Sequence, residues 1–187
     1  MPAYRLRIAA LATLTALTAC TTVPGSGVSV GYYNVRGTTA PEIDNNIRRN
    51  GPNNGHALAV ARIRMIPDVK YDQRPDGSCR YSVARVGVAA EITLPRFIDR
   101  GRTDRDLRQA IDNLDEYARF HEAVHVAIAE EYADRIGSNI RALPYAPNCS
   151  TLDGQAATIS RQLLREHDAA QRKFDRDEQA RLAALTS

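Results

Sequence analysis

Apolar and polar positions alternate along the first half of the chain and recur at helical spacing along the second half. Residues 28–35 are rich in β-branched and tyrosine side chains and predict a strand. A short helix is expected over residues 41–49, ended by an Asn-Gly-Pro sequence. Residues 57–65 and 80–94 predict two long strands that pair as a hairpin around a Pro-Asp-Gly turn.

After about residue 100 the hydrophobic period changes from two to three and a half, which indicates helices. Thr103, followed by Asp106 in a capping-box pattern, predicts the start of the first long helix, and Gly137 is expected to kink or end it. A last helix is predicted over residues 153–185. One stripe of the first long helix comprises Leu107, Ile111, Leu114, Ala118, His121, His125, Ile128, Tyr132 and Ile136.

Strands followed by helices favour an α+β fold, with a small antiparallel sheet packed on two long helices. The length of 187 residues fits one domain, and 43% hydrophobic residues exclude wholesale disorder. The net charge of +3 comes from 25 basic and 22 acidic residues that are interleaved along the chain. A nucleic-acid-binding protein would show a larger or clustered basic excess, so we expect no nucleic-acid partner.

The first residues carry a targeting signal. Arg5 and Arg7 precede an uncharged apolar run over residues 8–17, which is too short to span a membrane and suits a secretory signal peptide. The run ends in Leu-Thr-Ala-Cys, which resembles the processing box of bacterial lipoproteins, with cleavage before Cys20 and a lipid on its sulfur. The alternative is an ordinary signal peptide, which would leave Cys20 without a role.

The lipoprotein interpretation divides the chain into a signal peptide (residues 1–19), a tether (residues 20–27) and the domain (residues 28–187). Thr21 is not the aspartate associated with retention at the inner membrane, so we expect a periplasmic protein anchored to the outer membrane. In that oxidising compartment Cys79 and Cys149 are expected to form a disulfide, which stabilises the fold by roughly 4 kcal/mol. The alternative is two buried free thiols.

The sequence His121-Glu122-Ala-Val-His125 has the spacing of a zinc site. Residues four apart lie on the same helix face, so both imidazoles can reach one Zn²⁺ ion. Glu122 can accept a proton from a zinc-bound water as that water attacks a peptide carbonyl. The alternative is a pair of core histidines that are satisfied by hydrogen bonds.

Five segments of the chain resemble a bacterial domain-of-unknown-function family described as predicted secreted zinc-dependent proteases. They are GYYNVRGTT at residues 31–39, RNGP at 49–52, TLPRF at 93–97, HEAVHVAIA at 121–129 and Phe174-Asp175. The resemblance implies a zincin-like fold and metallopeptidase chemistry, and it covers nearly the whole domain.

The third metal ligand is open. Many relatives carry a His-Gly pair after the Tyr-Asp pair of the last helix, where this chain has Ala180-Arg181. Glu178 is the first choice as replacement, with Asp175 orienting a ligand histidine. The roles of Glu178 and Asp175 can also be reversed, and His167 is a third candidate. A solvated charged helix face is the alternative for all of these residues.

These features predict a zinc metallopeptidase of the bacterial envelope that hydrolyses peptide or protein substrates. The alternative is a non-catalytic envelope lipoprotein, an inactive relative that binds cell-wall material or protein partners. Tyr32 or Tyr33 could stabilise an oxyanion, although packing is the simpler role for both, and Tyr117 is expected to pack. By analogy with other zinc peptidases, the strand that ends in Thr93-Leu94-Pro95 could be an exposed edge along which a substrate binds, and simple strand termination is the alternative for these residues.

Overall fold

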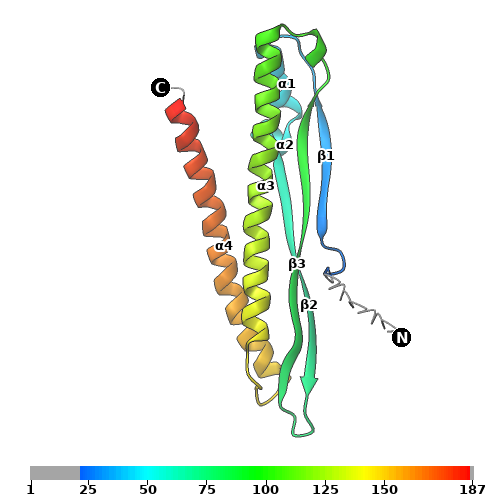
Figure 1. Cartoon of the computed structure of the whole chain (residues 1–187), viewed down its shortest axis with the longest axis vertical. Coiled ribbons are helices and arrows are strands. Elements are labelled where there is room, and N and C mark those ends of the chain that lie inside the picture. Colours follow the sequence, from blue (N-terminus) through cyan, green and yellow to red (C-terminus); the bar gives the residue numbers. More distant parts are fainter. Residues whose placement is uncertain (1–21, 186–187) are drawn as a thin grey trace, which may run out of the picture.

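The computed structural model describes residues 22–185, so the predicted signal peptide and Cys20 lie outside the described residues. The fold is α+β and has three layers: a sheet, the long helix α3 (Arg105–Arg141) and the long helix α4 (Cys149–Leu185). Figure 1 shows α3 running along the sheet and α4 on the other side of α3, with the C-terminal end of α4 diverging from it. Within residues 22–185, no helix is both long and apolar enough to cross a membrane.

The sheet has three strands, β1 (Gly27–Val35), β2 (Val60–Gln73) and β3 (Cys79–Phe97), in the order β1-β3-β2. β2 and β3 form the predicted antiparallel hairpin, but β1 pairs with β3 in parallel, so the prediction of an antiparallel sheet was wrong and the sheet is mixed. The reason is topological. The hairpin occupies one edge of β3, and β1, which runs in the same direction as β3, takes the other edge.

The central position of β3 also overturns the prediction of an exposed edge at its end. Thr93 pairs with Gly31 of β1 on one side and with Val60 of β2 on the other. Pro95 lies beyond the start of β2 and pairs with β1 alone. The edge strand of the hairpin is therefore β2.

Helix α3 begins one residue later than the capping pattern predicts, because Asp104 is its N-cap and accepts a hydrogen bond from the Leu107 backbone N–H at 2.8 Å. Gly137 neither kinks nor ends the helix. A Cβ atom at Gly137 would lie 3.3 Å from the carbonyl oxygen of Ala84, so the glycine allows α3 to approach β3 closely. The helix continues for one further turn, to Arg141.

Helix α3 has two buried faces rather than the single predicted stripe, because it lies between the sheet and α4 (Figure 1). The face toward the sheet is formed by small and medium side chains that pack on the inward-facing residues of β3. It comprises Ile111, Ala118, Glu122, Val126, Ala129, Ala133 and Ile136. His121, His125 and Tyr132 of the predicted stripe are only partly buried, and they contact α4 instead.

Helix α4 is fixed at its start by the disulfide between Cys79 and Cys149, as predicted. Helix α4 begins at Cys149, four residues earlier than predicted. Asp153 in its first turns accepts hydrogen bonds from the hydroxyls of Tyr71 and Tyr81, at 2.7 Å and 2.6 Å. These contacts hold the N-terminal end of α4 against the β2–β3 hairpin.

The described part of the predicted tether packs onto the domain. Val23 is only 8% exposed. A Cβ atom at Gly87 of β3 would lie 2.7 Å from the Cβ atom of Val23, so the glycine makes room for it. The chain is therefore part of the folded domain from Val23 onward.

Candidate metal centre

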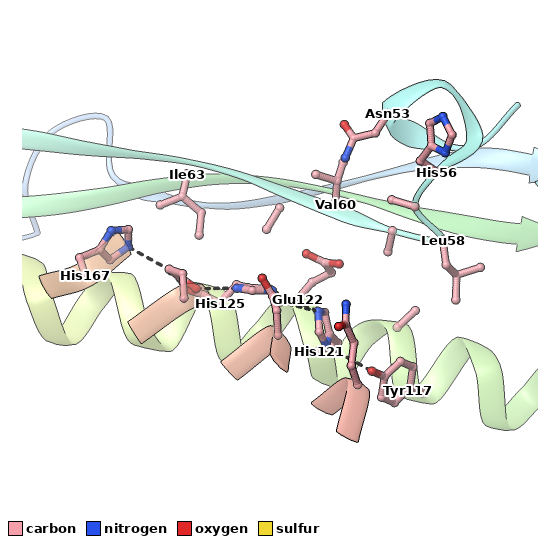
Figure 2. A pocket seen from close by; sticks show the side chains of 17 residues that line it. Asn53, His56, Leu58, Val60, Ile63, Tyr117, His121, Glu122, His125 and His167 are labelled. Carbon is pink, nitrogen blue, oxygen red and sulfur yellow. Dashed lines mark hydrogen bonds and ion pairs between the residues drawn. The ribbon is translucent and has the colours of Figure 1, made fainter. Parts of the chain in front are cut away.

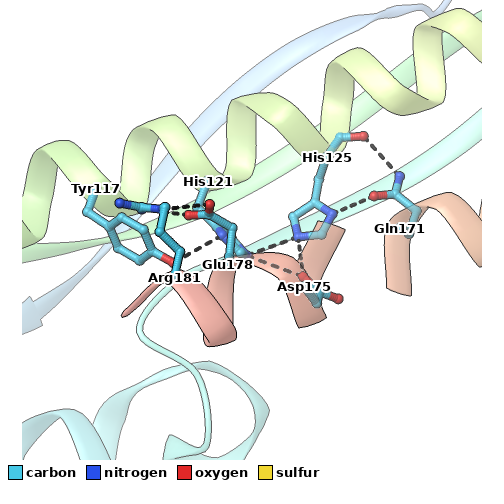
Figure 3. A network of polar contacts seen from close by, with 7 residues as sticks. All are labelled: Tyr117, His121, His125, Gln171, Asp175, Glu178 and Arg181. Carbon is cyan, nitrogen blue, oxygen red and sulfur yellow. Dashed lines mark hydrogen bonds and ion pairs between the residues drawn. The ribbon is translucent and has the colours of Figure 1, made fainter. Parts of the chain in front are cut away.

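The two histidines of the zinc motif lie on the face of α3 that contacts α4, where they meet Asp175 (Figure 3). The Nε2 atoms of His121 and His125 are 3.1 Å apart. Oδ1 of Asp175 lies 3.5 Å from Nε2 of His121 and 3.1 Å from Nε2 of His125. Two imidazole nitrogens and one carboxylate oxygen thus converge on a single point between the two helices.

The structure brings Asp175, rather than Glu178, to the histidines. Both carboxylate oxygens of Glu178 accept hydrogen bonds from Arg181, at 2.9 Å and 2.8 Å. The physical reason is helix geometry, because three residues along α4 turn the side chain by about 300° and advance it by about 4.5 Å. Glu178 therefore lies beside Tyr117, which precedes His121 by one turn of α3 and contributes to lowering the pKa of the Glu178 carboxyl group. The first choice from the sequence is corrected to the alternative, Asp175.

His167, the third candidate ligand, does not join the cluster. Its Nδ1 atom lies 3.1 Å from Oδ1 of Asp168, and its Nε2 atom lies 3.0 Å from Nε2 of Gln171. Its ring packs edge-on against Tyr132 of α3. Phe174, the neighbour of Asp175, packs against both histidine rings of the cluster, with centroid distances of 4.9 Å to His121 and 5.2 Å to His125.

Gln171 and Tyr117 are site residues that the sequence analysis missed. Gln171 bonds Nδ1 of His125 through Oε1 and donates from Nε2 to the backbone oxygen of His125 at 3.0 Å. The hydroxyl of Tyr117 lies 3.4 Å from Nδ1 of His121. A signal was present, since polar residues recur every three or four positions along α4, at 167, 171, 175 and 178, which places them on one face.

Glu122 lies on the sheet side of α3, one position after the first histidine, and it is 5% exposed. Burial raises the pKa of its carboxyl group, and Asp175 adds to this. His125 and a hydrogen bond from the backbone N–H of Ala61 in β2 oppose the rise in pKa. The Glu122 carboxylate thus lies between Ala61 of β2 and His125 of α3. Its raised pKa makes it a stronger base than an exposed glutamate.

Burial of His121 favours its neutral form. Burial lowers the pKa of His121, the neighbouring His125 lowers it further, and Asp175 and Glu178 act in the opposite direction. A neutral imidazole is the form that can ligate a metal ion, so the lowered pKa of His121 is compatible with such a role.

An open cleft of about 680 Å³ lies between α3, α4 and the start of β2. Figure 2 shows Glu122, His121 and His125 on its floor, and the strand residues Val60 and Ile63 across from them. His56, in the segment before β2, also lines the rim of the cleft. The cleft is large enough to admit several residues of an extended chain.

The two N-terminal tyrosines have structural roles. The hydroxyl of Tyr33 donates to the backbone oxygen of Leu58 at 2.8 Å, and burial raises its pKa to about 12. Leu58 lines the cleft, so Tyr33 supports its wall from behind. Tyr32 is 44% exposed and stacks under the guanidinium group of Arg96.

Comparison with known proteins identifies one family. No curated protein and no solved structure gives a significant match to the chain, so the zincin-like fold remains a prediction. The model of the family described as "Bacterial protein of unknown function (DUF922)" matches residues 30–181. This match includes all of β2 and α3 and nearly all of α4, the elements that carry the cluster and line the cleft. The protein therefore belongs to that bacterial family of unknown function.

Proposed function

We propose that the protein is a zinc-dependent metallopeptidase whose ligands are His121, His125 and Asp175 and whose general base is Glu122. The observation that carries this proposal is the convergence of three ligand atoms beside an open cleft. The two histidines come from one helix and the carboxylate from another, so their meeting is a property of the tertiary structure and not of the motif.

The spacing of the three atoms fits zinc. In a tetrahedral site with bonds of about 2.0–2.1 Å, the ligand atoms lie about 3.3–3.4 Å apart. The distances between the atoms of His121, His125 and Asp175 are 3.1, 3.1 and 3.5 Å. These side chains need to move by only a few tenths of an ångström. Two histidines and one carboxylate are also the donor set of one class of catalytic zinc sites.

A zinc ion in this place would supply Lewis acidity, polarising a substrate carbonyl and lowering the pKa of a water molecule. The protein residues account for the remaining chemistry. Glu122 reaches the cleft from the same helix turn as His121, and its buried carboxylate can accept a proton there and return it to the leaving amine. The raised pKa of Glu122 suits a group that must take up and release a proton near neutral pH.

The edge strand supports a peptide as the substrate. β2 pairs with β3 on one side, and the residues at its start, Val60, Ala61 and Ile63, line the cleft. An extended peptide that lies along this edge would pass over Glu122 and the ligand cluster. This step is an analogy with strand addition in other peptide-binding proteins, and it replaces the edge that the sequence analysis assigned to β3.

The envelope location is part of the proposal. A lipid on Cys20 would be followed by only two residues before Val23, which is buried in the domain. Such a short connection would hold the domain close to the membrane surface and restrict the enzyme to substrates near it. The disulfide between Cys79 and Cys149 supports an oxidising compartment.

Elemental analysis of protein purified without chelators tests the metal site. We expect about one zinc ion per chain, and its loss in His121→Ala and Asp175→Ala. His56→Ala, which removes an exposed histidine at the rim of the same cleft, is the matched control and should keep the zinc. A wild-type protein that takes up no zinc would refute the proposal.

Hydrolysis of a mixed peptide library separates the enzyme from the non-catalytic alternative. The wild-type protein should cleave peptides, and Glu122→Gln should retain zinc but lose cleavage. If zinc-loaded wild-type protein cleaves no more than Glu122→Gln does, the domain is a zinc-containing binding protein of the envelope.

A further inference from the structure

We propose that Gln171 is a positioning residue that fixes the tautomer of His125, so that the lone pair of its Nε2 atom is directed at the metal position. The inference rests on the proposed zinc site. It concerns a residue of α4 that contacts one ligand at two points, through Nδ1 of the ring and through the backbone oxygen.

The direction of each hydrogen bond follows from the chemistry of the groups. The backbone oxygen of His125 can only accept, so the Gln171 atom that lies 3.0 Å from it is the amide nitrogen, Nε2. The amide oxygen of Gln171 therefore faces Nδ1 of His125 (Figure 3). An amide oxygen also can only accept, so Nδ1 of His125 carries the proton. In a neutral imidazole the other nitrogen, Nε2, then has a free lone pair.

His167 completes the arrangement by holding the second N–H of the Gln171 amide. The nitrogen atoms Nε2 of Gln171 and Nε2 of His167 lie 3.0 Å apart, so the amide donates and the imidazole accepts. Nδ1 of His167 then carries its proton and donates to Oδ1 of Asp168 at 3.1 Å. The chain Asp168–His167–Gln171–His125 has one consistent set of donors and acceptors, and this set leaves Nε2 of His125 unprotonated.

The alternative tautomer would compete with the metal. With the proton on Nε2, His125 would donate to Oδ1 of Asp175, which is only 3.1 Å away. Both ligands would then be engaged with each other and closed to a cation. Gln171 opposes this state because its oxygen would face a bare Nδ1 atom, acceptor against acceptor. Groups that orient a ligand histidine in this way typically change metal affinity by about 10- to 100-fold.

The experiment compares Gln171→Leu and Gln171→Glu with the wild-type protein. Leucine removes both hydrogen bonds, whereas glutamate retains an oxygen that accepts from Nδ1 of His125. Gln162→Leu is the matched control, because Gln162 is an exposed glutamine of the same helix that bonds Glu166. Each protein is first examined without metal at about pH 8, with nitrogen-15 NMR of the histidine rings as the readout. Zinc affinity is then measured by competition with a chromophoric chelator.

We expect the Nδ1–H tautomer of His125 in the wild-type protein, Gln162→Leu and Gln171→Glu, and a shift toward Nε2–H in Gln171→Leu. The apparent Kd for zinc should rise by about 10- to 100-fold in Gln171→Leu and stay within about threefold in Gln162→Leu. An Nε2–H tautomer in the wild-type protein, or an unchanged tautomer in Gln171→Leu, would overturn the inference. Because the tautomer is read without metal, that result differs from a wild-type protein that fails to bind zinc, which would overturn the proposed function instead. If Gln171→Leu does not fold, retention of Nδ1–H in Gln171→Glu at wild-type zinc affinity supports the inference, and its loss there refutes it.

Discussion

Loss of the disulfide between Cys79 and Cys149 should both destabilise the domain and weaken the metal centre. The bond joins the first residue of β3 to the first residue of α4, and α4 carries Asp175. The double variant Cys79→Ala with Cys149→Ser removes the bond and leaves no free thiol at either position. Detachment of α4 would withdraw Asp175, one of the three proposed ligands, from the two histidines of α3.

The magnitude follows from the length of chain that the bond closes. The two cysteines are 70 residues apart, and closing such a loop lowers the entropy of the unfolded chain by about 15 cal/mol/K, or about 4 kcal/mol at 25 °C. For a domain of this size that loss corresponds to a fall in Tm of about 10 °C. Cys79 is fully buried, so removal of its sulfur adds a packing loss of about 1 kcal/mol.

Urea unfolding followed by circular dichroism, with EDTA present throughout, measures this change apart from any effect of metal. Wild-type protein reduced under the same conditions serves as the control and should match the double variant apart from the packing loss. Zinc affinity is then measured in the native state and should fall in the variant. A change of less than about 1 kcal/mol in the free energy of unfolding would show that packing alone holds α4, and it would refute the chain-entropy argument.

Four further predictions concern the site and the fold. Asp175→Asn should weaken zinc binding by more than about 100-fold and Glu178→Gln by at most about 10-fold, because only Asp175 touches both histidines; equal effects in a chelator competition would contradict this assignment. Glu122→Gln should leave zinc content unchanged and lower the rate of peptide cleavage by about 10²- to 10⁴-fold, and a variant as active as wild type would exclude Glu122 as the base. Removal of zinc with EDTA should lower the Tm, with a loss of about 2.7 kcal/mol if the free ion stood at 100 times its Kd; an unchanged melting curve would argue against a site formed only in the folded state. Gly87→Ala should cost about 1–3 kcal/mol in urea unfolding, since its Cβ atom would lie 2.7 Å from that of Val23, and a neutral result would mean that the N-terminal segment moves aside freely.

The strands and helices themselves follow largely from local pattern. Alternation along residues 57–65 and 80–94 predicts the hairpin because both strands are adjacent in sequence and one turn joins them. The strand order is different, because β1 contacts β3 across more than fifty intervening residues. No local pattern states which edge of the hairpin a separate strand will join, and for this reason the mixed sheet was not predicted.

Helix α3 illustrates how periodicity loses information. Its predicted stripe contains His121 and His125, while Glu122 and Val126 face the sheet on a second stripe. A helix that is covered on two sides has apolar residues over a wide arc, and a search for one face merges the two. The prediction therefore found the residues of α3 and misjudged which neighbour each would contact.

The sequence by itself determined the features that depend on a few residues close together. These are the pair of histidines on one helix face, the glutamate between them, and the pairing of two cysteines in a chain with a predicted export signal. A helix turn fixes the relative positions of His121 and His125 wherever the helix lies.

Only the tertiary structure decided what meets those residues. Asp175 and Glu178 are one helix turn apart and share a face, and the sequence favoured Glu178, but the packing of α4 on α3 directs Asp175 to the histidines and Glu178 to Tyr117 and Arg181. The same packing places Gln171 against His125. The physical reason is that the rotation of one helix about its axis is set by the sum of all its contacts, and no single residue encodes it.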